Sequence, residues 1–215
     1  MQKLFSPDSK FMRFMGRAGD LILLNFFFLL CCVPVVTIGA ASTALYAVCF
    51  RFGTVRERGT VKSFFQAFKA NFRQATAVWL IIAFCGITAG INTYVFYLMP
   101  GSIRYAFVLF AILFILVLLI FSYAFPLLSQ FDNKTYSTLK NALVLSLGYL
   151  PRSVLMAALN LLPWIVLLKD TVLFFQAGFL WAAVYFAAAA YANTFLLRGV
   201  FAPYLPEEDD EPEEP

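Results

Sequence analysis

Long uncharged segments constrain this chain more than any other feature. Four segments of at least 27 residues contain no Asp, Glu, Lys or Arg: 21–50, 74–103, 105–131 and 171–197. A fifth, 141–168, is interrupted only by Arg152. About 20 apolar residues of helix suffice to cross the hydrocarbon core of a bilayer. The sequence therefore predicts an all-α, polytopic membrane protein rather than a soluble protein with long core helices.

Composition and charge support this class. The chain is 62% hydrophobic and 13% charged, whereas about a quarter of the residues in a soluble domain carry charge. Residues 207–215 hold seven of the twelve acidic residues, so residues 1–206, with all sixteen bases and five acids, carry +11. The bases flank the apolar segments, which favours contact with anionic lipid head groups over nucleic acid.

The residues that carry most enzyme chemistry are missing or scattered. The chain has no histidine, and its four cysteines lie inside apolar segments without the spacing of a zinc site or a disulfide framework. No nucleophile–base pair or phosphate-binding loop is visible. We therefore predict no catalytic, cofactor-binding or metal-binding residues, and a protein that is not an enzyme.

The first apolar segment, 21–50, differs from the others. As one straight helix it would be about 45 Å long, well beyond the roughly 30 Å core, and Pro34 lies near its middle. It is either one kinked span or a broken element that returns to the side from which it entered. If it returns, fourteen bases lie on one side of the membrane and two on the other; if it crosses, the division is ten and six. Because cytoplasmic loops are rich in Lys and Arg, we favour the broken, returning element, with basic loops in the cytoplasm of a cell (inner) membrane protein.

Two short amphipathic helices are expected at the membrane surface, at about 8–18 and at 60–73. In the second, Phe64, Phe65, Phe68 and Phe72 recur at helical spacing, and bases mark the opposite face. Packing of the same face on the protein's own surface is the alternative.

The remaining segments predict four full spans, which complete a single membrane domain over residues 1–205. The expected spans are about 75–99, 105–128, 141–168 and 171–197. Gly86 and Gly90 in the first of these favour internal helix packing over a homodimer seam. Residues 206–215 form an acidic, proline-containing tail that is expected to be disordered. It either stays solvated or contacts the protein's own basic loops.

Uncharged polar residues inside the apolar segments are the remaining candidates for function. The functional candidates are Asn25, Pro34, Thr37, Gly39, Asn92, Asn160 and Gln176. Asn193 and Thr194 are also polar residues of the apolar segments, but they are not among these candidates. Interhelical hydrogen bonding is the ordinary role of such amides. A cavity lined by Asn25, Asn92, Asn160 and Gln176 would instead indicate a transporter or channel for a neutral polar solute.

Several motifs resemble the YesL family of bacterial integral membrane proteins. They comprise Asn25 with the apolar residues after it, 34–40, 44–46, 64–69, 71–76, 79–80, 125–128 and 139–142. The resemblance implies a membrane domain without an established function, whose members are discussed alongside carbohydrate uptake. It implies no catalytic or binding residues, and the acidic tail is not part of it.

The expected function is therefore a non-enzymatic membrane component accessory to solute transport, with carbohydrate as a candidate solute. Its expected partners are the bilayer and either a transport permease or a second copy of the chain. A small transporter or channel is the alternative, and a membrane enzyme is third.

Overall fold

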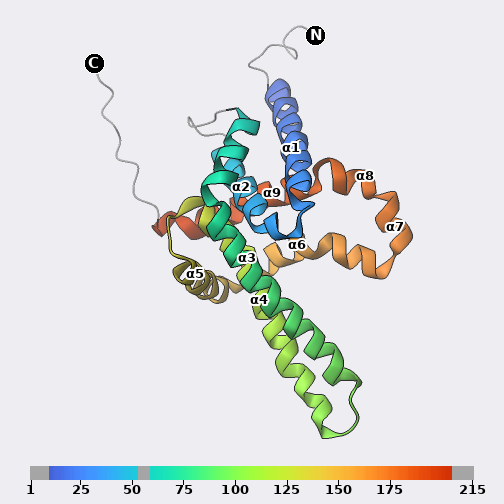
Figure 1. The fold of residues 1–215 in the computed structure, drawn as a ribbon. Coiled ribbons are helices and arrows are strands. Elements are labelled where there is room, and N and C mark those ends of the chain that lie inside the picture. Colours follow the sequence, from blue (N-terminus) through green and yellow to red (C-terminus); the bar gives the residue numbers. More distant parts are fainter. Residues whose placement is uncertain (1–9, 53–58, 205–215) are drawn as a thin grey trace.

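The computed structural model describes residues 10–52 and 59–204 (Figure 1). Their helices are α1 (Lys10–Cys32), α2 (Ile38–Arg51), α3 (Thr60–Leu98), α4 (Ala106–Gln130), α5 (Thr135–Gly148), α6 (Leu150–Lys169), α7 (Thr171–Gln176), α8 (Gly178–Leu180) and α9 (Phe186–Phe201). Short 3-10 turns occur at Val35–Thr37, Ser102–Tyr105 and Ala202–Tyr204, and a π-helical turn (the π turn) spans Trp181–Tyr185. These ranges contain no strand, which confirms the all-α prediction.

Within the described residues, five helical segments are long and apolar enough to cross a membrane. They are Met15–Cys32, Thr60–Leu98, Ser102–Gln130, Leu150–Lys169 and Gly178–Tyr204. The chain is therefore a multi-pass membrane protein, as the uncharged segments predicted. Four of the five correspond to the expected full spans, and the fifth belongs to α1.

The first apolar segment is broken and reverses direction. Helix α1 ends at Cys32, and Pro34, which cannot donate a backbone hydrogen bond, precedes the short turn that leads into α2. The Thr60 hydroxyl at the start of α3 donates a 2.7 Å hydrogen bond to Asp20 Oδ1 in the first part of α1. The chain after α2 thus lies beside the part of α1 where the segment began. The segment is therefore broken into two helices, and the chain runs back beside α1. That both of its ends lie on the same side of a membrane stays a prediction.

The two amphipathic segments are not separate helices. Residues 10–18 are the first turns of α1, and residues 8 and 9 lie outside the described ranges. Residues 60–73 continue into α3, a single helix of 39 residues. The continuity has a simple cause: Gln74, Ala75, Thr76 and Ala77 contain neither Gly nor Pro, so nothing ends the helix there. Phe64 is fully buried and Phe65 contacts Phe27 at 5.3 Å between ring centroids, so the aromatic face packs on the protein itself.

Two of the expected spans are divided. Residues 141–168 fall in α5 and α6, which are separated at Tyr149 (φ −120°, ψ 45°). Gly148 before this residue and Pro151 after it account for the break, since both disfavour helix interior. Residues 171–197 are divided among α7, α8, the π turn and the first part of α9. The tail at 206–215 lies outside the described residues.

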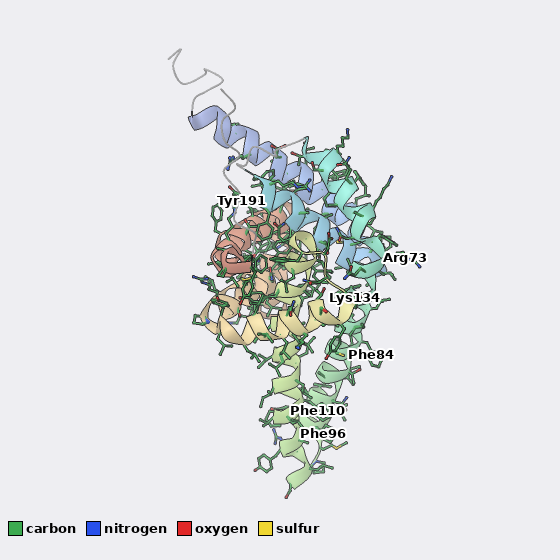
Figure 2. All side chains as sticks on the ribbon, turned by 90° about the vertical axis from the view of Figure 1, so that its left-hand side faces the viewer. Arg73, Phe84, Phe96, Phe110, Lys134 and Tyr191 are labelled. Carbon is green, nitrogen blue, oxygen red and sulfur yellow. The ribbon has the colours of Figure 1, made fainter. Side chains whose placement is uncertain are left out.

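Helix α2 forms the centre of the molecule. Every residue from Gly39 to Phe50 is buried, and α1, α3, α4 and α9 pack around it. By contrast, the later part of α3 and the first part of α4 form a long hairpin that projects from the other helices (Figures 1 and 2). Phe84, Phe96 and Phe110 lie along this projection, whereas Arg73, Lys134 and Tyr191 lie on the broad part (Figure 2).

Candidate functional site

Asn25 fastens α1 to the π turn. Its side chain is fully buried, and Nδ2 donates to the carbonyl oxygens of Trp181 at 3.1 Å and Ala182 at 2.6 Å. Its Oδ1 accepts a hydrogen bond of 3.0 Å from the backbone N–H of Ala187. A π turn disturbs the regular pairing of helix backbone groups, and such turns recur at functional sites. Asn25 thus satisfies backbone groups on both sides of an irregular turn in a distant segment.

Aromatic side chains support the same turn. The rings of Trp181 and Tyr185 meet edge to face at 4.7 Å, and the Tyr185 hydroxyl donates to the Leu159 carbonyl at 2.8 Å. Phe186, at the start of α9, contacts Phe28 of α1. The π turn is therefore held by α1 and by α6.

A second set of polar side chains, the amide cluster, consists of Tyr46, Ser122, Asn160 and Asn193. Asn193 Nδ2 on α9 donates to the Tyr46 hydroxyl on α2 at 3.1 Å and to Asn160 Oδ1 on α6 at 3.0 Å. Asn160 Nδ2 donates to Ser122 Oγ on α4 at 3.4 Å. Four helices thus contribute one side chain each to a continuous chain of hydrogen bonds. Asn193 is fully buried, and its Oδ1 accepts no hydrogen bond from the described residues.

The amide cluster is electrically neutral, which limits its chemistry. It contains amides and hydroxyls but no carboxylate, thiolate or cation that could exchange a proton readily near neutral pH. The described residues also contain no group of three His, Cys, Asp or Glu side chains that could hold a metal. The arrangement can hydrogen-bond a neutral polar group, or it can join helices in an apolar environment.

Pro34, Thr37 and Gly39 form the junction between α1, α2 and α3. The Thr37 hydroxyl bonds to the carbonyls of Cys31 and Pro34, and Trp79 Nε1 on α3 donates to the Val35 carbonyl at 2.8 Å.

At Gly39 the backbone of α2 lies close to α3. A Cβ added to Gly39 would lie 2.6 Å from Trp79 Cβ and would overlap the Ala75 carbonyl oxygen. Only glycine allows this approach of α2 to α3, so the structural role of Gly39 is explained.

The remaining predicted candidates lie elsewhere. Asn92 Nδ2 bonds to the carbonyl of Thr88, four residues back in the same helix. Gln176 is exposed at the C-terminal end of α7. Asn25 and Asn160 share no hydrogen-bond partner. Among the described residues, no hydrogen bond joins any two of the four amides expected to line one cavity, and that cavity stays a prediction.

Sequence reasoning missed two members of the amide cluster. Tyr46 and Ser122 were not singled out, because one aromatic or one serine in an apolar helix carries no signal of a partner in another helix. Asn193 was noted as an intramembrane amide but not as a functional candidate. The pairing of Asn193 with Asn160 depends on two helices that meet only in the folded protein.

Similarity to known proteins supports the expected family. Residues 21–93 match the family model described as "Protein of unknown function, DUF624". The chain is also 29% identical over 200 residues to a protein of Bacillus subtilis (strain 168) described as "Uncharacterized protein YteU", covering 91% of this chain and 84% of the relative. The expected family resemblance is confirmed. No solved structure matches the chain.

The DUF624 match covers part of the candidate site. It includes α2, most of α1 and most of α3, and with them Asn25, the Pro34–Gly39 junction and Tyr46. Asn160, Asn193 and the π turn lie beyond the matched residues. The hydrogen bonds of Asn25 and Tyr46 thus join the segment that matches the family model to the C-terminal helices.

Proposed function

We propose that this DUF624 protein is a non-enzymatic membrane component that acts through another membrane protein, accessory to solute transport. The observation that carries the proposal is the distribution of the buried amides. Asn25 binds backbone groups of the π turn, and Asn160 and Asn193 bind each other, so these side chains are used to join helices. A carrier that moved a polar solute by itself would need several such groups free to face one shared path.

The projecting hairpin supplies a surface for such a partner. Phe84 is 73% exposed and Ile91 is 58% exposed, and the hairpin carries further apolar side chains around them. In a membrane this surface can contact lipid or the helices of a second protein. We propose that it packs against a transport permease, and that carbohydrate is the class of solute concerned.

Affinity purification with a photo-crosslinking residue at Phe84 tests this proposal in native membranes. A discrete adduct with a transport permease is expected. The matched control places the same residue at Phe64, which is fully buried and should give no adduct with another protein. Repeated recovery of the chain alone, crosslinked to lipid, would contradict the accessory role.

One observation favours the transporter alternative. Asn193 Oδ1 is a buried acceptor without a partner among the described residues, and it lies in the amide cluster. A neutral hydroxyl-bearing solute could donate to it. Uptake of labelled neutral solutes into proteoliposomes that contain this chain alone would support the alternative, provided that Asn193→Leu abolishes uptake in a protein that still folds. If the unaltered protein transports none of these solutes, the transporter alternative is wrong.

We further propose that the chain lies in the cell membrane with its basic loops in the cytoplasm. Arg51 ends α2, Lys62 lies in the first turn of α3 and Lys134 directly precedes α5. Arg104 and Lys169 lie instead at the α3–α4 turn and at the end of α6. Lys and Arg are enriched in cytoplasmic loops. Reporters fused after Met15 and within residues 51–60 should both report a cytoplasmic location, and opposite locations would overturn the proposed orientation.

A further inference from the structure

A pocket lies where α4, α5 and the end of α9 meet. Its volume is about 380 Å³, and its lining combines apolar with polar residues: Phe131, Leu145 and Phe201, and Asn133, Asn141 and Tyr204. The rings of Phe131 and Phe201 contact edge to face at 5.5 Å and form part of its wall. The pocket can therefore take an apolar side chain together with polar groups at its rim.

Basic side chains surround this pocket. Lys134 and Lys140 are exposed, and each is the sequence neighbour of a lining residue, Asn133 and Asn141 respectively. Arg73 is also exposed, and its neighbour Gln74 donates a side-chain hydrogen bond to the Asn133 carbonyl, which places Arg73 by the same turn. Figure 2 shows Arg73 and Lys134 on the broad part of the molecule.

The charge at the rim is not neutralised by the described part of the chain. Asp132 is the acidic residue of the turn, so the three bases and this one acid carry +2. No ion pair joins Arg73, Lys134 or Lys140 to a described acidic residue. The rim is suited to a segment with several carboxylates.

The chain itself delivers such a segment to this place. Tyr204, the last described residue, lines the pocket, and eleven residues follow it. They begin with Leu205 and Pro206 and continue with seven acidic residues among 207–215. Eleven residues reach at most about 40 Å, so the carboxylates cannot travel far from the pocket rim. A tethered segment has a high effective concentration at a nearby site.

We propose that residues 205–215 dock on this pocket as an intramolecular ligand. Leu205 enters the apolar part of the pocket beside Phe131 and Phe201, and the following carboxylates pair with Lys134, Lys140 and Arg73. The docked tail covers a basic surface that would otherwise bind anionic lipid head groups or an acidic partner. Because the rim is exposed to solvent, the association weakens as salt screens the charges.

Zero-length carbodiimide crosslinking of the full chain, read by mass spectrometry, tests this proposal. The reagent joins a carboxylate to a lysine amine that is in contact with it. We expect crosslinks from 207–214 to Lys134 or Lys140, with a several-fold lower yield at high salt. Lys62 is the matched control, since it is an exposed lysine in the first turn of α3, eleven residues before Arg73 and away from the pocket lining. Equal yields at Lys62, Lys134 and Lys140, or none at Lys134 and Lys140, would overturn the proposal.

A substitution in the tail separates docking from simple charge attraction. Leu205→Asp adds a carboxylate but removes the apolar anchor. Docking predicts a several-fold lower yield at Lys134 and Lys140, whereas unspecific attraction predicts an equal or higher yield. The same measurement in vesicles of phosphatidylglycerol and of phosphatidylcholine tests the competing occupant. Crosslinks that persist in both kinds of vesicle support docking of the tail. Loss of the crosslinks in phosphatidylglycerol vesicles alone would show that the basic residues bind anionic lipid in preference to the tail.

Discussion

Helix α2 and the projecting α3–α4 hairpin are both strongly apolar, with one arginine each (Arg51 and Arg104), yet they occupy opposite environments. Every α2 residue from Gly39 to Phe50 is buried, whereas Phe84, Ile87, Ile91 and Ile112 of the hairpin are all more than half exposed. In lipid, hydrophobicity alone does not decide which helix is central, because the surroundings are apolar too.

Small residues decide the difference. After its first residue, Ile38, helix α2 continues with Gly39, Ala40, Ala41, Ser42 and Thr43, which let neighbouring backbones approach. The hairpin has small residues along its inner seam: Gly86 faces Val117, Gly90 faces Phe114, and Ala89 is buried. This arrangement confirms the prediction of internal packing for the two glycines. Matched substitutions in the two regions should therefore have unequal effects.

The largest difference is expected for a single methyl group at two glycines. Gly39→Ala should destabilise the protein by about 3 kcal/mol or more, or prevent folding, because the new Cβ overlaps α3. Gly90→Ala should leave stability unchanged or raise it by up to about 1 kcal/mol, since its Cβ would meet Phe114 at an ordinary 3.5 Å and alanine favours helix. Unfolding in mixed detergent micelles measures both variants. Equal stabilities would show that α2 and α3 are not in close contact.

Two asparagines provide the next comparison. Asn25→Leu leaves the Ala187 N–H and two carbonyls of the π turn without their partner and should cost about 2–3 kcal/mol. Asn92→Leu loses one bond within its own helix, which should change stability by less than about 0.5 kcal/mol. The free energy of unfolding and hydrogen exchange at residues 181–187 check the prediction. If hydrogen exchange at residues 181–187 were the same in Asn25→Leu as in the unaltered protein, Asn25 would not stabilise the π turn.

A valine pair compares packing directly. Val48 in α2 is 3% exposed and Val108 in the hairpin is 46% exposed. Val48→Ala should cost about 1–2 kcal/mol by leaving a cavity, whereas Val108→Ala should cost less than about 0.5 kcal/mol because lipid or detergent fills the space. A shift of similar size in both, measured by thermal unfolding in one detergent, would indicate that the hairpin packs against protein under those conditions.

The smallest effect is expected for a hydroxyl. Tyr46→Phe removes one acceptor of Asn193 and should cost about 0.5–1 kcal/mol. Tyr94→Phe, at a residue 66% exposed with no hydrogen bond to the described residues, should be neutral. A double-mutant cycle of Tyr46→Phe with Asn193→Leu should show coupling, and additive effects would argue against a hydrogen bond between the two side chains.

Much of the architecture was available from the sequence. The uncharged segments predicted the spans, Pro34 and the distribution of bases predicted that 21–50 is broken and returns, and the glycine pair predicted an internal seam. The divisions at Tyr149 and at the π turn were less accessible. Gly148 and Pro151 flank the first division, but no residue type at 181–185 distinguishes a π turn from α-helix. The amide cluster could be predicted only as a list of polar residues.

The sequence by itself determined that this chain is a helical membrane protein, because the cost of burying charge in hydrocarbon restricts spanning segments to uncharged residues. Proline and glycine act locally and mark some of the helix ends, such as those at Pro34 and Gly148, but Pro126 and Pro163 lie inside continuous helices. Tertiary structure alone decided which apolar helix is central and which amides meet. Those outcomes depend on shape and on hydrogen bonds between distant segments, and hydrophobicity is the same for a helix in contact with lipid and a helix in contact with protein.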